Sequence, residues 1–205
     1  MSYSEDIYAE SPCNPDTVAA LGPLAALAGV WEGKGGIDIA PKAGGVRTHA
    51  YEERIELHPV DPGANGPQTL YALRYHAWMN KPGEATTYHD QVGYWLWEPG
   101  TGTVMHSLTI PRGQTVLAAG TAAADARQFT LTATRGSSEY GICSNPYLDA
   151  NFRTERFEIT VTIHDDGTWS YDEDTVMTIR GEEFHHRDRN RLTRVGPYRP
   201  NPAVG

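Results

Sequence analysis

Apolar and polar residues alternate along most of the chain after residue 28, and a period of two residues is typical of β-strands. The strongest signal is a hairpin between His89 and Gly113, where two segments rich in aromatic and β-branched residues are joined by the turn sequence EPGTG. Other alternating segments lie at residues 51–58, 69–80, 115–122, 129–134, 156–163, 168–179 and 183–194. Helical periodicity is absent after Ala28, so we predict roughly nine to ten strands.

Proline, glycine and asparagine mark the breaks between these segments. We expect a turn at Lys42–Gly45 and loops at Asp61–Gln68 and Arg135–Arg153, because these residue types interrupt regular strands. Residues 1–28, before the first strand, lack this alternation. Residues 1–13 have the polar composition of a flexible tail, and residues 14–28 carry two short helix signals, beginning at Asn14 and at Pro23.

One stretch, Leu21–Gly36 with the sequence LGPLAALAGVWEGKGG, joins these helices to the first strand. If its second half is extended, Trp31 shares a face with three glycines. Glycine weakens a strand unless the position needs a bend, a bulge or a very close approach of another group. We interpret the glycines as the close-packed start of a barrel, with Trp31 filling one end under a helical lid.

The strand count and short hairpins predict an all-β fold, a roughly ten-stranded antiparallel up-and-down β-barrel with a short N-terminal helical lid. A β-sandwich is the alternative that the same pattern allows. We assign residues 14–205 to this single barrel domain, because all-β domains of this length commonly stay undivided. A barrel of this size has room for one small apolar ligand.

The net charge and the cysteine content limit the classes of partner and the cellular compartment that we expect for this protein. The chain has 17 Lys and Arg against 26 Asp and Glu, a net charge of -9, which opposes binding to nucleic acid or to anionic membranes. Two cysteines, Cys13 and Cys143, form no metal or redox motif, and the N-terminus lacks a signal-peptide pattern. We therefore expect a cytoplasmic protein.

Histidines are the side chains best suited to chemistry, because the chain has no nucleophile elbow, dinucleotide fingerprint or Walker loop. His106 has apolar neighbours and is expected to be buried and hydrogen-bonded, or else to contact a ligand. His76 is expected to face outward, and His89 to lie at a barrel mouth. His185 and His186 are adjacent, so one of them faces the interior and could bind a metal or cofactor.

The glycine stretch also carries a resemblance. Gly29–Gly35, GVWEGKG, is similar to the GxWxGxG motif of the nitrobindin family, small haem-binding β-barrels formerly described as fatty-acid-binding-protein-like. The segments LGPLAALAG, YEE and HDQVGYW resemble the adjoining parts of that family. The ending FHHRDRNRLTRV resembles the HxDxNxLxR pattern of its longer members. The resemblance extends from about Leu21 to Val195.

The resemblance implies a calycin-like barrel that binds haem b through a histidine near the C-terminus, with conversion of peroxynitrite to nitrate at ferric haem and binding of nitric oxide. It places the iron ligand at His186, with His185 as the rival, and makes Trp31 and His106 further candidates for the cofactor site. The residues after His186 depart from the shorter nitrobindins, in which mostly apolar residues follow the ligand. Here the next four residues are polar.

Two other functions stay open. The first is a haem-free carrier of an apolar metabolite, oriented by His106 or by aromatic residues. The second is a reaction on an organic substrate with His89 or His106 as acid or base. In every case the expected partner is a small molecule: peroxynitrite, nitric oxide or an apolar metabolite. A homodimer is also an open expectation, although the sequence identifies no patch for it.

Overall fold

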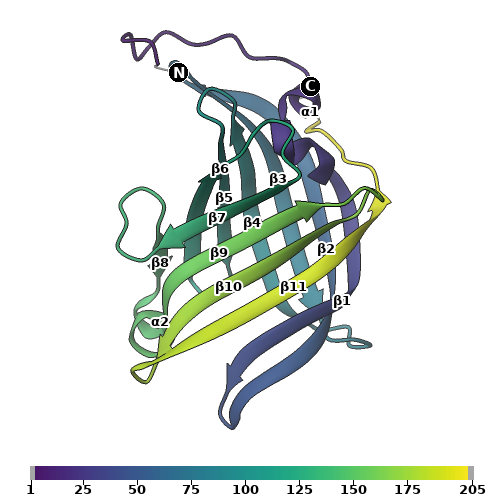
Figure 1. The fold of residues 1–205 in the computed structure, drawn as a ribbon, viewed down its shortest axis with the longest axis vertical. Coiled ribbons are helices and arrows are strands. Elements are labelled where there is room, and N and C mark those ends of the chain that lie inside the picture. The colour runs from purple at the N-terminus through teal and green to yellow at the C-terminus, as the bar shows by residue number, and fades with distance from the viewer. Residues whose placement is uncertain (1–2, 203–205) are drawn as a thin grey trace.

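Ten antiparallel strands form a closed barrel in the computed structural model, which describes residues 3–202 (Figure 1). Neighbouring strands follow the order β5-β4-β3-β2-β1-β11-β10-β9-β7-β6, and pairing of β5 with β6 closes the ring. The strands are β1 (Gly29–Lys42), β2 (Gly45–Asn65), β3 (Gln68–Asn80), β4 (Thr87–Glu98), β5 (Thr103–Ile110), β6 (Gln114–Thr121), β7 (Gln128–Thr134), β9 (Arg153–Ile163), β10 (Trp169–Ile179) and β11 (Glu182–Gly196). The predicted ten-stranded up-and-down barrel is confirmed.

Short helices cover one end of the barrel. Helix α1 (Thr17–Ala20) and the 3-10 helix η1 (Gly22–Leu27) lie at the upper end in Figure 1. Leu21, Leu24 and Leu27 are fully buried. The indole Nε1 of Trp31 donates a hydrogen bond to the carbonyl oxygen of Leu27 at 2.8 Å, which joins the first strand to the helices above it. The first helix signal in the sequence begins at Asn14, whereas the residue that caps α1 is Asp16.

Strand β1 changes phase at its glycines, and this change decides which side chains enter the barrel. Its pairing with β2 shifts between Gly33 and Gly36, as expected for a β-bulge. Trp31 is buried before the shift, and Gly36, Asp38 and Ala40 are buried after it. A side chain on Gly36 would place its Cβ 2.3 Å from the ring of Tyr51, so this position requires glycine.

The two predicted loops contain regular structure, so both predictions were wrong in part. Strand β2 continues through a pairing irregularity after Val60 and ends at Asn65, leaving only a tight turn in which Gly66 has φ of 57°. The segment Arg135–Arg153 contains strand β8 (Ile142–Ser144), which pairs with β6, and helix α2 (Pro146–Asn151). The helix is too short to show periodicity, and the side chain of Asn145 caps it.

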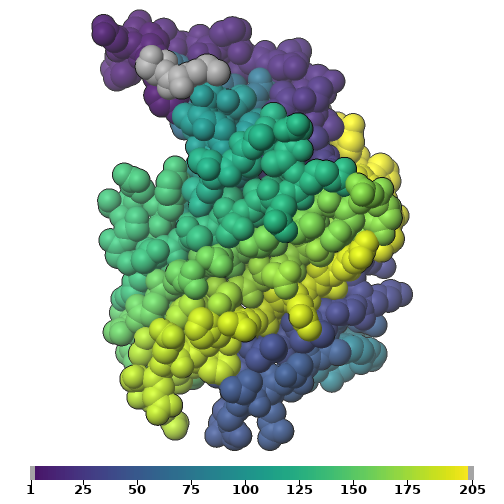
Figure 2. All heavy atoms as spheres, viewed as in Figure 1, coloured from purple at the N-terminus to yellow at the C-terminus, as the bar shows by residue number. Residues whose placement is uncertain are grey.

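The strands leave no broad gap in the face seen in Figure 2, where those coloured green, yellow and blue lie in contact. The N-terminal segment lies at one end of this face. The predicted tail (1–13) and barrel domain (14–205) each extend beyond the described residues, at 1–2 and 203–205. Within residues 3–202, none of the helices is long and apolar enough to span a membrane.

Candidate functional site

A cavity inside the barrel has two lobes with shared lining residues. The first lobe has a volume of about 120 Å³ and the second about 350 Å³. Both lobes are lined by His89, Arg112, Glu173, His186 and Asp188. The second lobe is also lined by apolar side chains, namely Leu108, Ile110, Val116, Phe157 and Met177. The cavity therefore combines an apolar surface with a cluster of ionisable groups.

The two adjacent histidines of β11 point in opposite directions. His186 lines both lobes of the cavity. His185 instead contacts Asp174, with its Nδ1 2.7 Å from the carboxylate, and it lines neither lobe. Strand alternation explains the difference, since Asp188 and Asn190 share the inward face with His186 while Arg187 and Arg189 are exposed.

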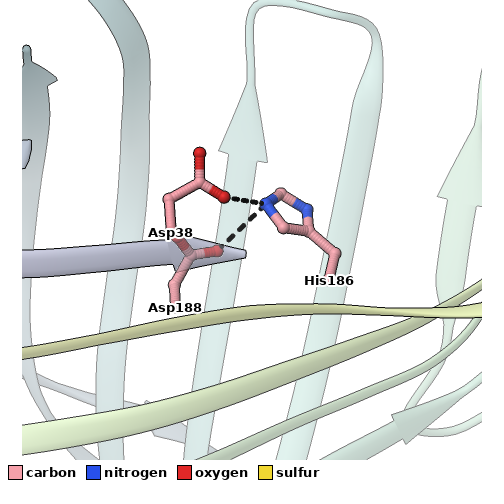
Figure 3. A group of neighbouring side chains, drawn as sticks. All are labelled: Asp38, His186 and Asp188. Atoms are coloured by element: carbon pink, nitrogen blue, oxygen red, sulfur yellow. Dashed lines mark hydrogen bonds and ion pairs between the residues drawn. The ribbon is translucent and has the colours of Figure 1, made fainter. Parts of the chain in front are cut away.

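The imidazole of His186 is held by two aspartates, one on the neighbouring strand β1 and the other on β11 itself. Its Nε2 lies 3.0 Å from Oδ1 of Asp38 on β1 and 3.3 Å from Oδ2 of Asp188 on β11 (Figure 3). Burial alone would lower the pKa of His186, but the hydrogen bond to Asp38 and the nearby carboxylates outweigh it and raise that pKa. Burial raises the pKa of Asp188 to about 6.

A second group of polar side chains lies deeper, around Glu53 of β2. Oε2 of Glu53 accepts hydrogen bonds from the Tyr171 hydroxyl at 2.8 Å and from Nδ2 of Asn190 at 2.9 Å. The Tyr171 hydroxyl is also 2.8 Å from that of Tyr51. Burial raises the pKa of Glu53 to about 7, even though both hydrogen bonds favour the ionised form.

Four carboxylates therefore face one cavity: Asp38, Glu53, Glu173 and Asp188. Burial, and then the charge of Asp188, raise the pKa of Glu173 to about 8. Among the described residues, none of the four forms an ion pair with lysine or arginine, and their only cationic contact is His186. Lys42 and Arg112 line both lobes without pairing with these carboxylates.

His106 lies on the first lobe in an aromatic environment. It is 1% exposed and stacks on Trp95 with ring centroids 3.9 Å apart. Burial lowers the pKa of His106 to about 3, so the ring is neutral. Within the described part of the chain, neither ring nitrogen has a hydrogen-bond partner. The predicted burial is correct, whereas the expected hydrogen bond to a neighbour is absent.

The other candidates are distributed around the barrel. Trp31 lies under the helices and lines neither lobe. His89 lines both lobes and contacts Gln91 at 3.2 Å. His76 is exposed and pairs with Asp90, as its predicted outward direction requires. Of the candidates predicted from the sequence, the cavity therefore brings together His89, His106 and His186.

None of the four carboxylates is among the site residues predicted from the sequence. Glu53 follows the alternation of Tyr51 and Ile55, and Asp188 that of His186, so these two positions could have been found. Asp38 could not have been found in this way. If side chains alternated without interruption from the buried Trp31, Asp38 would point out of the barrel. Only the bulge at Gly33–Gly36 brings it into the cavity.

A histidine that binds haem iron must be a neutral imidazole with a free nitrogen, beside an apolar space for the macrocycle. His186 faces the cavity, and the second lobe supplies apolar side chains. Its Nε2 is engaged by Asp38 and Asp188, which occupy the side of the ring that iron would approach. The residues therefore fit haem on one condition, that the two aspartates release Nε2.

Comparisons with known proteins agree with this architecture. Residues 20–194 match the model of the THAP4-like, heme-binding beta-barrel domain. The crystal structure of Rv2717c from M. tuberculosis has a similar fold, with a TM-score of 0.62 and 20% identity over 88% of this chain and 98% of that chain. At this identity the likeness concerns the fold alone. No curated protein matches the sequence.

Proposed function

Because the chain belongs to the THAP4-like, heme-binding β-barrel domain family, we propose that its barrel binds haem b and that Nε2 of His186 is the protein ligand of the iron. The observation that carries the proposal is the position of His186, whose imidazole lines both lobes of the cavity beside the apolar side chains of the second lobe. Burial of a macrocycle against such side chains contributes most of the binding free energy of an apolar cofactor.

Other residues of the cavity have distinct roles in this proposal. Lys42 and Arg112 line both lobes and are suited to hold the two carboxylates of haem through charge-assisted hydrogen bonds. If bound through His186, haem would supply the iron chemistry by which we propose that peroxynitrite is isomerised to nitrate and nitric oxide is bound. Trp95 and His106 stack on each other and give the first lobe an aromatic wall.

A haemin titration of the purified full-length chain tests the proposal. We expect saturation at one haem per chain and a Soret band distinct from that of free haemin. Addition of nitric oxide should then shift this band, and nitrate should form from peroxynitrite faster than in buffer. A spectrum that stays that of free haemin at every ratio would overturn haem binding, and a haem complex inert towards both reagents would overturn the chemistry.

Neutralising the two aspartates is expected to strengthen haem binding. In the double variant Asp38→Asn/Asp188→Asn, Nε2 no longer faces carboxylates that hold its proton. A hydrogen bond to a charged group is worth about 1.5–3 kcal/mol, so haemin affinity should rise about tenfold or more. The measurement is the same titration, with Asp174→Asn as control, because Asp174 forms its ion pairs within residues 3–202 with the outward His185 and with Arg187. An unchanged or weaker affinity in the double variant would contradict this explanation.

A second function, a haem-free carrier of a small apolar molecule, is favoured by His106. A buried imidazole with both nitrogens unpaired is costly unless a ligand supplies the missing hydrogen bond. In this alternative the ligand has an apolar body and one polar group that reaches His106. Native mass spectrometry of the purified chain would then detect a retained ligand, and the protein would ignore haemin.

A further inference from the structure

The group around His186 has the donor atoms of a metal site. One imidazole nitrogen and two carboxylate oxygens, from Asp38, His186 and Asp188, all lie within 4.8 Å of one another. Within residues 3–202 no other group of three or more histidine, cysteine or acidic side chains meets this criterion. The donors come from two paired strands, so the backbone positions them independently of any ligand (Figure 3).

In the described part of the chain, the two aspartates of this group share a single basic partner. Asp38 is 7% exposed, yet its only cationic contact among the described residues is His186. Asp188 relies on the same imidazole, whose Nε2 lies 3.3 Å from its Oδ2. Buried carboxylates in proteins are normally paired or bound to metal. One imidazole supplies at most a single positive charge to the two aspartates, whereas a divalent cation can balance both.

An independent observation also indicates a ligand in this cavity. His106 belongs to another strand, lines the same lobe as the three donors, and is 1% exposed with both ring nitrogens unpaired. Burying a polar ring without a partner is unfavourable. A cation held by three protein ligands keeps open positions for water or a small molecule. A small molecule bound there that extends along the first lobe would supply His106 with a hydrogen bond.

We propose that Asp38, His186 and Asp188 bind a first-row divalent transition-metal ion inside the barrel, without a porphyrin. A mixed nitrogen and oxygen donor set suits zinc, iron or manganese, because an imidazole is a poor ligand for calcium or magnesium. This inference goes beyond the proposed haem function. Haem iron and a free cation would use the same Nε2, so the two occupants exclude each other.

Zinc binding to the full chain tests the inference. Protein freed of metal with EDTA and dialysed should bind Zn²⁺ with one ion per chain by isothermal titration calorimetry. Both His186→Ala and Asp38→Asn/Asp188→Asn should weaken this binding by about 100-fold or more, since even residues outside the ligand sphere change metal affinity by 10–100-fold. Wild-type protein, but neither variant, should also melt at a higher temperature with zinc present.

The matched control is His185→Ala, which removes the outward neighbour that contacts Asp174. Its zinc affinity should equal that of the wild type. Retention of full affinity in the double aspartate variant, or its loss in His185→Ala, would overturn the site. Because asparagine is isosteric with aspartate, the double variant should fold, and an unchanged circular dichroism spectrum would verify this.

Different results would contradict the haem proposal and the cation proposal. The double aspartate variant should bind haemin more tightly and zinc more weakly, so its two affinities move in opposite directions. Wild-type protein that binds haemin but not zinc would overturn only the cation site. Protein that binds zinc but not haemin would overturn only haem binding. If both bind, zinc added first should slow or prevent the appearance of the Soret band.

Discussion

Replacing Glu53 with glutamine is expected to raise the free energy of unfolding by about 3 kcal/mol at pH 8 and by about 1 kcal/mol or less at pH 5. The pKa of Glu53 is about 7 in the folded chain, because burial disfavours its charged form. The unfolded chain has the ordinary value, near 4.5. Between these values the folded state binds more protons, so the contribution of Glu53 to stability falls as the pH rises.

Glutamine removes this dependence without breaking the local contacts. Its carbonyl oxygen can accept the hydrogen bonds that Tyr171 and Asn190 now donate to Oε2 of Glu53. Urea unfolding of EDTA-treated wild-type and variant protein between pH 5 and pH 8 measures the effect. The control is Glu52→Gln, at the neighbouring position on the opposite face of β2. If the difference between Glu53→Gln and wild type stays constant across this range, Glu53 is not a buried carboxyl with a raised pKa.

The barrel could be predicted from the sequence because the alternation of apolar and polar residues is a local property. The hairpin of β4 and β5 and the direction of Glu53 both follow from this pattern. Strand alternation also requires that His185 and His186 face opposite ways, but it does not determine which of them faces inward. That choice depends on how β11 pairs with β1 and β10, which is set by contacts distant in sequence.

The direction of Asp38 cannot be predicted from alternation. A bulge moves every later side chain of a strand to the opposite face. The sequence suggests a bulge through its glycines, but the position of the shift depends on Tyr51 and Asn190, which pack against Gly36 and Gly33. These contacts join residues that are far apart in the chain. Asp38 therefore enters the cavity, while Ile37 and Ile39 lie outside it.

The convergence of carboxylates is likewise a tertiary property. Glu52 and Glu53 are adjacent and diverge, whereas Asp38, Glu53, Glu173 and Asp188 come from four strands and share a cavity. Burial, and then the charges of Asp188 and Glu53, raise the pKa of Glu173. The missing partner of His106 could not be predicted either, because it depends on every group that surrounds the ring in the folded barrel.

The largest effect on ligand binding is expected from His186. Removing an axial ligand leaves only the apolar contacts of the cofactor and its carboxylates, so His186→Ala should weaken haemin binding by about 100-fold or more. His185→Ala should leave it unchanged, because that side chain lies outside the cavity and contacts Asp174. Free imidazole added to His186→Ala should restore part of the spectrum by occupying the space that the side chain leaves.

Haemin absorption spectra of wild type, His186→Ala and His185→Ala at equal concentrations test most directly whether His186 holds the iron. We expect a protein-bound Soret band for wild type and His185→Ala, and the spectrum of free haemin for His186→Ala. A Soret band of equal intensity and position in His186→Ala would contradict the claim that this histidine holds the iron.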